Sequence, residues 1–197
     1  MRRLVLGLEI ECEREYEREY DWGAGDSPPR GDAMNELNKG LAIGMRGAAA
    51  RRALAACRRQ IEAWGVVLPR VKPLALDFGL GDFARTGLIE CWIANEARAG
   101  YCGKLLFVSD GQTCPEHRHR RKHETFFVLK GRVRMRCGPR ARIMREGQVL
   151  AVPPGRKHSF TGVGPVLLLE LSMPCEVDDN GFTDRRIPIG YNARRRA

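Results

Sequence analysis

Small and apolar residues in the first third of the chain recur with a helical period. The pattern begins at Asp32, a suitable N-cap, and its apolar positions are spaced by three and four residues while arginines take the opposite side. Gly65 and Pro69 end it. We therefore expect a helical segment within residues 32–70 that packs its apolar face against the rest of the protein. The apolar positions are Ala50, Leu54, Cys57, Ile61 and Trp64.

From residue 71 onward the pattern changes to short β-rich runs separated by glycine and proline. Strands at such spacing are typical of an all-β sandwich or barrel, and a chain of 197 residues fits one domain. We predict a mainly β domain over residues 71–197. Residues 1–31, where glutamate alternates with arginine before a Gly/Pro stretch, are expected to form a loosely ordered arm. The β-rich runs are residues 88–95, 104–109, 124–129, 132–137, 148–153, 158–162 and 165–171.

Composition narrows the class of protein. With 43% hydrophobic residues the chain can bury a core, and no stretch approaches the roughly 20 apolar residues of a membrane span. Glu9, Glu11 and Glu13 interrupt the apolar start, which is therefore a poor signal peptide. The seven cysteines never form a C-x-x-C pair, which argues against a disulfide framework and a thiolate zinc site. We expect a soluble, cytoplasmic protein with reduced thiols and no membrane partner.

The net charge of +10 comes from one window of the sequence. Residues 118–145 hold eleven Lys or Arg and a single acidic residue, whereas the charges elsewhere balance. The window lacks the interleaved aromatic residues of single-strand binders and any helix-turn-helix pattern. We therefore expect no nucleic-acid partner, and interpret Arg132, Arg134 and Arg136 as a solvent-facing or subunit-facing strand surface.

All four histidines lie in two short motifs, and all but His123 are at candidate ligand positions. His117 and His119 are two residues apart, so on an extended segment they point to the same side, and Glu124 follows a short turn later. In the second motif a Pro/Gly turn delivers His158. Imidazole and carboxylate groups on a site with open positions suit a divalent transition metal. The first motif therefore indicates a metal site.

Both motifs resemble those of the cupin family. The first reads G-x5-H-x-H-x4-E-x6-G over residues 111–131, and the second reads G-x5-P-x-G-x2-H over residues 147–158, with Gly162 in place of the closing Asn. The resemblance implies a single double-stranded β-helix (jelly-roll) barrel, mainly β, which often pairs as a homodimer. It also implies one divalent metal, for which we expect manganese first and zinc, iron, cobalt or nickel as alternatives. The implied metal ligands are His117, His119, Glu124 and His158.

Alternation along the strand predicts which side chains share the metal side. If Lys130 and Gly131 form a two-residue hairpin turn, the arginine strand points outward. By the same alternation Lys122, two residues before Glu124, leans toward the metal, with a solvated rim lysine as the alternative. The residues then expected inside the barrel with Glu124 are Phe126, Val128, Val133, Met135 and Cys137.

A further polar candidate is Glu170, the only acidic residue in the apolar run 166–171. A buried carboxylate without a partner is costly or has a raised pKa, which suggests a role, with a structural salt bridge as the alternative. Asp178 and Asp179 then form an acidic corner with Asn180. We expect these two carboxylates to bind sugar hydroxyls, with an ordinary turn as the alternative.

The flanking residues are similar to the D-lyxose isomerase branch of the cupins. The similarity lies in GLIECWIAN (87–95), Lys104, the H-x-H-x-x-K-x-E spelling of the first motif, Glu-x-Ser and the Asp-Asp-Asn corner. It implies a metal-dependent aldose-ketose isomerase acting on a small-molecule sugar. Such a reaction needs a Lewis acid, a base that moves a proton between C1 and C2, and a cation that steadies the enediolate. We assign the base to Glu170 and the cation to Lys122.

Two alternatives and the substrate stay open. A site of three histidines and one glutamate also supports cupin dioxygenases, although oxygen insertion does not require a cation such as Lys122. A non-catalytic sugar-binding cupin is the other alternative. Only residues 132–146 separate the two motifs, where relatives carry a longer insertion. A pentose, a hexose and an acidic sugar therefore all stay open as substrates, and Arg156 and Lys157 would suit an acidic sugar.

Overall fold

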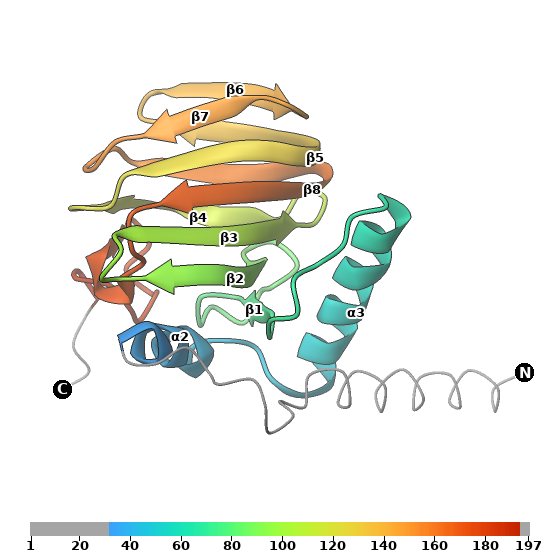
Figure 1. Cartoon of the computed structure of the whole chain (residues 1–197), viewed down its shortest axis with the longest axis horizontal. Helices are drawn as coiled ribbons and strands as arrows, with labels where there is room; N and C mark the ends of the chain where they lie inside the picture. The colour runs from blue at the N-terminus through green and yellow to red at the C-terminus, as the bar shows by residue number, and fades with distance from the viewer. Residues whose placement is uncertain (1–31, 194–197) are drawn as a thin grey trace, which may run out of the picture.

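The computed structural model describes residues 32–193, in which two helices precede a curled antiparallel sheet (Figure 1). The helices are α2 (Asp32–Ala42) and α3 (Gly47–Ala63), and a 3-10 turn, η1 (Val177–Asp179), precedes the last strand. The predicted arm of residues 1–31 lies outside the described residues. The strands are β1 (Leu74–Leu76), β2 (Leu88–Glu96), β3 (Tyr101–Val108), β4 (Thr113–His119), β5 (Glu124–Cys137), β6 (Arg140–Arg145), β7 (Val149–Val152), β8 (His158–Ser172) and β9 (Asn180–Phe182).

The two longest strands, β5 and β8, organise the sheet. The strand order is β1-β2-β3-β8-β4-β9, and β5 pairs with β8, β6 and β7. Each pairing is antiparallel, and β8 contacts β3 with one end and β4 with the other while it lies along β5. In Figure 1 the sheet curls from β6 and β7 at the top to β1 near the helices. The predicted mainly β barrel with an N-terminal helical segment is confirmed.

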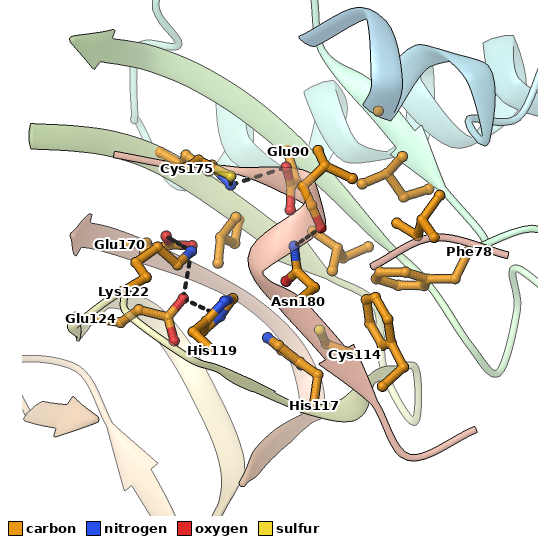
Figure 2. Close-up of a pocket in the computed structure, with 18 of the residues that line it drawn as sticks. Phe78, Glu90, Cys114, His117, His119, Lys122, Glu124, Glu170, Cys175 and Asn180 are labelled. Carbon is orange, nitrogen blue, oxygen red and sulfur yellow. Dashed lines mark hydrogen bonds and ion pairs between the residues drawn. The ribbon is translucent and has the colours of Figure 1, made fainter. Parts of the chain in front are cut away.

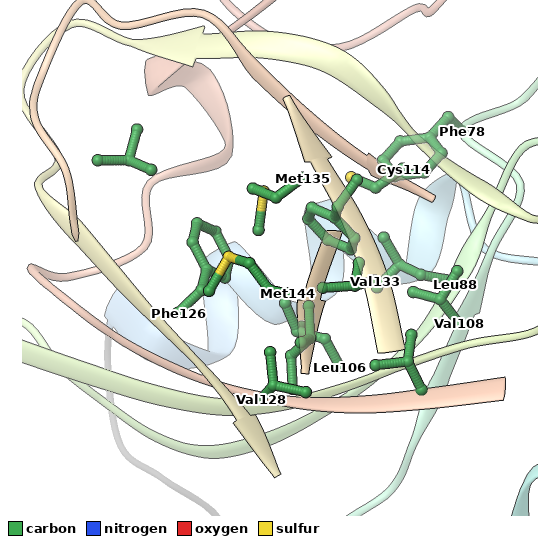
Figure 3. Close-up of a cluster of buried hydrophobic side chains, with 14 of the residues drawn as sticks. Phe78, Leu88, Leu106, Val108, Cys114, Phe126, Val128, Val133, Met135 and Met144 are labelled. Atoms are coloured by element: carbon green, nitrogen blue, oxygen red, sulfur yellow. The ribbon is translucent and has the colours of Figure 1, made fainter. Parts of the chain in front are cut away.

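Inward side chains form a core inside the curled sheet (Figure 3). Leu106 of β3, Val128 of β5 and Leu168 of β8 are almost completely buried there, and Met144 of β6 closes the cluster. Burying one such side chain contributes about 1.5–3 kcal/mol to stability. This core fixes the strands that also carry the polar residues of the site.

Helix α3 packs against the outer face of the sheet. Cys57 and Ile61 are buried in a second cluster with Ile89 of β2 and with Leu105 and Phe107 of β3. The helical period predicted for this region is therefore confirmed, although residues 43–46 interrupt the helix and separate α2 from α3. Among residues 32–193, neither helix has the length and apolar character that a bilayer span requires.

The hairpin turn predicted at Lys130 and Gly131 is wrong. β5 runs through both residues as one strand of 14 residues and pairs with β8 before and after them. Gly131 lies against β8 so closely that a Cβ atom would stand 2.3 Å from the carbonyl oxygen of Pro165. Glycine at this position therefore lets the long strand lie against β8 where a turn was expected.

The predicted facing of the β5 side chains is nevertheless observed. Register shifts between Val128 and Lys130 and between Gly131 and Val133 change the alternation at the middle of the strand. Val128 before the shifts and Val133 after them are therefore both fully buried. The two register shifts therefore change which side chains face inward, as the hairpin turn was expected to do. On the outward side Arg132, Arg134 and Arg136 are exposed.

Replacing Gly131 by alanine tests the close approach of the two strands. Gly131 has φ +80°, and Gly147 has φ +82° with no atom within 4 Å of a Cβ, so Gly147→Ala is the matched control. Both variants carry left-handed strain of about 1 kcal/mol, but only Gly131→Ala adds a collision with backbone. We expect Gly131→Ala to lower the free energy of unfolding by at least about 2 kcal/mol more than the control, measured by chemical denaturation. Equal losses would contradict the close approach.

Candidate active site

Three strands bring the four predicted metal ligands to one point inside the barrel. His117 and His119 lie on the inner face of β4, Glu124 begins β5 and His158 begins β8. The strand register sets His117 directly opposite His158. One ligand atom from each of the four residues can be chosen so that all lie within 4.8 Å of one another, and all four residues are buried. The residues that the sequence predicts as ligands are therefore gathered in one cluster.

The imidazole rings converge on the carboxylate of Glu124. Nε2 of His119 lies 3.1 Å from Oε1, and Nε2 of His158 lies 3.0 Å from Oε2. Neither contact has hydrogen-bond geometry, and both nitrogens and Oε2 are buried without a hydrogen-bond partner. Buried polar atoms in native proteins nearly always have a hydrogen-bond partner, so a group of buried nitrogen and oxygen atoms without one indicates a ligand. The donor set fits a divalent metal.

Backbone carbonyls fix the tautomers of two of the rings. Nδ1 of His117 lies 2.8 Å from the carbonyl oxygen of Pro115, and Nδ1 of His158 lies 3.1 Å from that of Arg156. A carbonyl oxygen can only accept, so Nδ1 carries the proton and Nε2 keeps its lone pair. This is the arrangement in which metal-ligating histidines are normally held.

The electrostatics of the cluster favour the ligating protonation states. Burial lowers the pKa of His117 well below its usual value of 6.5, and the neighbouring imidazoles lower it further. Burial also lowers the pKa of His119. Burial opposes ionisation of Glu124, but Lys122 and the imidazoles outweigh it and hold the pKa of that carboxyl well below its usual value. Neutral imidazoles and an ionised carboxylate are the forms that bind metals.

Lys122 joins the cluster to Glu170 (Figure 2). Its Nζ lies 2.8 Å from Oε1 of Glu124 and 3.1 Å from Oε1 of Glu170, and all three side chains are buried. Ser172 donates its hydroxyl to the same oxygen of Glu170 at 3.0 Å. Burial alone would lower the pKa of Lys122, but the carboxylates of Glu170 and Glu124 outweigh it and raise that pKa. The rim position considered for Lys122 is thus not observed.

The two aspartates of the acidic corner differ in their surroundings. Asp178 is exposed and forms an ion pair with Lys39 of α2 at 2.6 Å. Asp179 is buried, and its oxygens accept the backbone N–H groups of residues 120, 121 and 122 at 3.1–3.2 Å. Its Oδ2 also lies 4.0 Å from Nδ1 of His119. Asp179 therefore fixes the loop that carries Lys122 and lies behind the ring of His119, while the adjacent Asn180 lines the pocket.

The pocket extends beyond the residues that sequence reasoning selected. Its empty space, open solvent included, is about 630 Å3. The residues that line it include the histidines at 117 and 119, Lys122 and Glu170, and also Glu90 and Lys104. Gly40 and Ile43, from α2 and the residue after it, border it as well. Glu90 stands out in the run 87–95 as an acidic residue within a strand, which is the signal that could have identified it.

Comparisons with known proteins place this site in a family. The cupin domain model matches residues 105–172. A D-lyxose/D-mannose isomerase of Thermosediminibacter oceani is 32% identical over 139 residues, which cover 56% of this chain and 76% of that protein. The chain belongs to the D-lyxose isomerase family of cupins. A D-lyxose ketol-isomerase of Cohnella laeviribosi is similar to this cupin at 31% identity, over 56% of the chain and 75% of the relative.

Solved structures share the fold of this cupin. The L-ribose isomerase of Cellulomonas parahominis, determined with L-ribose, superposes with a TM-score of 0.57 at 15% sequence identity. The superposition covers 68% of this chain and 90% of that one. The likeness therefore extends beyond the part of the chain that the domain model matches.

Gly162, the departure from the second cupin motif, has a packing reason in this cupin. A Cβ atom at Gly162 would stand 2.2 Å from the carbonyl oxygen of Ser109. Its backbone N–H donates to the carbonyl oxygen of Gln112, and its own carbonyl oxygen accepts the backbone N–H of Gly111. No side chain, asparagine included, fits at this position without moving the loop between β3 and β4.

Asp179→Asn tests whether this carboxylate supports the predicted metal ligands. The amide removes the negative charge behind His119 and puts an N–H donor where an oxygen accepts backbone N–H groups, so the loop holding Lys122 should loosen. We expect the affinity for Mn2+ to fall by about 10- to 100-fold, measured by titration calorimetry. Asp178→Asn, which changes the exposed neighbour, is the matched control and should bind Mn2+ as the wild type does. Unchanged affinity in Asp179→Asn would contradict this role.

Proposed function

We propose that this cupin is a metal-dependent aldose-ketose isomerase of the D-lyxose isomerase type, which transfers a proton between C1 and C2 through an enediol. The observation that carries the proposal is the contact of Lys122 with both Glu124 and Glu170 inside a pocket. It sets a base and a cation beside a cluster suited to a metal. The names of the relatives support the same reaction.

The metal would be held by the three histidines and Glu124. Manganese is our first candidate, because a mixed imidazole and carboxylate set with open positions accepts it, while zinc, iron, cobalt and nickel suit the same ligands. When bound, the metal would supply Lewis-acid polarisation of the carbonyl and hydroxyl oxygens of the sugar. The orphaned nitrogens of His119 and His158 support a bound ion.

Glu170 is the proposed base. Burial opposes its ionisation, but Lys122 and Lys104 outweigh that effect and lower the pKa of its carboxyl, so it is an anion at neutral pH. The carboxylate takes the proton from C2 of the aldose and returns a proton to C1, while the hydroxyl proton on the C2 oxygen passes to the C1 oxygen. Its Oε1 is held by Lys122 and Ser172, which fixes the position of the carboxylate.

Lys122 is the proposed cation. Its ammonium group lies in the pocket between the carboxylates of Glu124 and Glu170, where negative charge develops on the sugar oxygens during proton transfer. A fixed charge in a site of low dielectric stabilises such a state more than water does. The dioxygenase and the non-catalytic sugar-binding protein give this buried pair no chemical task, so the isomerase is favoured.

The proposed substrate is a small sugar such as D-lyxose or D-mannose, the sugars in the names of the relatives. Asp178 and Asp179 stay a prediction as sugar-binding residues. Asp179 already accepts three backbone N–H groups, and Asp178 pairs with Lys39, so a sugar would have to share these carboxylates with their present partners.

The proposal includes a cytoplasmic homodimer without a nucleic-acid partner. On the outer face of the sheet Val149 and Leu171 are 55% and 54% exposed, and Phe127 of β5 pairs with Val149 in register. An exposed apolar face of this kind is commonly an interaction surface. Six cysteines among the described residues are free thiols, which suits a reducing compartment.

Glu170→Gln tests the assignment of the base. The amide keeps the shape of the side chain but cannot accept the C2 proton, so kcat for aldose-ketose conversion should fall by about 100-fold or more while the Mn2+ content stays that of the wild type. The enzyme is assayed with a panel of aldoses and ketoses, and the products are measured by chromatography. Glu96→Gln, at an exposed position of β2, is the control and should retain full activity. Full activity in Glu170→Gln would remove this residue from the mechanism.

A further inference from the structure

A second polar group lies in the pocket beside the proposed base. Trp92 of β2, Lys104 of β3 and Glu170 of β8 are direct neighbours across three adjacent strands, and all three line the pocket. Neighbouring residues in such a row share one face of the sheet. Lys104 is therefore within reach of the remaining carbons of a sugar whose C1 and C2 would lie at Glu170.

The ammonium of Lys104 has too few acceptors for its three N–H donors. Its side chain is 4% exposed, and its hydrogen-bond partner among the described residues is the thiol of Cys175 at 3.2 Å. A thiol sulfur is a weak acceptor. The carboxylate of Glu90 lies 3.6 Å away, and the ring of Trp92 lies 4.4 Å away at its centroid. A buried ammonium in this situation has donors to give to ligand oxygens.

Glu90 supplies an acceptor next to this donor. The indole N–H of Trp92 donates to its Oε2 at 2.7 Å and fixes the carboxylate in place. The side chain is 14% exposed and lines the pocket, so it can be reached from there. A hydroxyl group both donates and accepts, so two adjacent hydroxyls of a sugar fit the ammonium and the carboxylate together.

The charges select the chemical class of the ligand. Lys104 and Glu90 carry opposite charges and compensate each other, so this end of the pocket has no surplus positive charge for an anion. A terminal phosphate or carboxylate would lie against Glu90. The cations considered for an acidic sugar, Arg156 and Lys157, are exposed and do not line the pocket.

We propose that Lys104 and Glu90 form a distal subsite that binds hydroxyls beyond C2 and restricts the enzyme to uncharged sugars. This inference rests on the proposed isomerase function, because it places C1 and C2 at Glu170. It makes both residues determinants of specificity, with Trp92 positioning the carboxylate of Glu90.

Deoxy sugars test which hydroxyls the subsite binds. The wild type and Lys104→Met, both loaded with Mn2+, are assayed with D-lyxose and with analogues lacking the hydroxyl at C3, C4 or C5. For the wild type, kcat/KM with at least one analogue should be about 10- to 100-fold lower than with D-lyxose. In Lys104→Met the kcat/KM values for that analogue and for D-lyxose should differ by less than about threefold, because the ammonium group that binds the hydroxyl has been removed. Lys130→Met, at the surface near Glu146, is the control and should keep the discrimination of the wild type.

Glu90→Gln gives an independent test of the charge selection. The wild type should prefer D-lyxose to D-lyxose 5-phosphate by at least about 100-fold in kcat/KM, and the neutral amide should narrow that preference by about tenfold or more. Thermal unfolding of both pocket variants shows whether the fold is kept. Unchanged discrimination in folded Lys104→Met, or a wild type that prefers the phosphate, would overturn the subsite.

The failure of the subsite can be separated from failure of the isomerase function. Binding of the non-reacting alditol of lyxose to the Mn2+-loaded protein is measured by calorimetry, which requires no turnover. If Lys104→Met binds the alditol about tenfold more weakly than the wild type, the subsite is supported even if no sugar is isomerised. The lack of isomerisation would then count against the isomerase function alone. Equal binding in both proteins overturns the subsite even if the wild type is an active isomerase.

Discussion

The buried ammonium of Lys122 lies between two buried carboxylates, and the site depends on this contact. Removing one partner from a buried ion pair commonly costs about 3–5 kcal/mol, because the other charge is left uncompensated. Here one carboxylate, Glu124, belongs to the cluster that could hold a metal, and the other, Glu170, is the proposed base. The network thus ties the protonation state of the base to the cluster that would hold the metal. It also accounts for the burial of these three charged side chains inside the barrel.

The fold supplies this network with fixed positions. Glu124 begins β5, and Glu170 lies on β8, the strand that pairs with β5 over most of its length. Lys122 precedes β5 in a loop whose backbone N–H groups are held by Asp179. The charged groups are therefore set by a strand pair and by a buried carboxylate that comes late in the chain. This arrangement explains how an acidic corner predicted to bind sugar also serves the structure of the site.

The sequence predicts the positions along the chain better than the contacts across it. The spacing of His117 and His119 and the motif around His158 identified the cluster, because metal ligands on strands follow short local rules. The hairpin at Lys130 failed because two irregularities inside a continuous strand leave the same burial pattern as a turn. Lys104 and Glu90 were not assigned to the site, since their approach depends on the register of β2 against β3, and that register is a property of the folded sheet.

The charge of the molecule and the charge of its pocket follow different patterns. Arg132, Arg134 and Arg136 point away from the barrel interior and contribute to the net charge of +10. Inside, the lysines at 104 and 122 face the carboxylates of residues 90, 124 and 170, so these five side chains have a formal excess of one negative charge, which a bound divalent cation would reverse. An uncharged sugar is suited to this nearly balanced interior. The positive exterior therefore gives no guide to the substrate.

The central claim is that the pocket moves a proton between C1 and C2 of a sugar. It is tested most directly by incubating the Mn2+-loaded protein with D-lyxose in deuterium oxide and examining the ketose by NMR. Proton transfer through Glu170 predicts a ketose product that carries solvent deuterium at C1, formed only when the metal is supplied. A ketose without deuterium would show that the hydrogen reaches C1 without exchanging with solvent, and the absence of any ketose would contradict the isomerase assignment for this sugar.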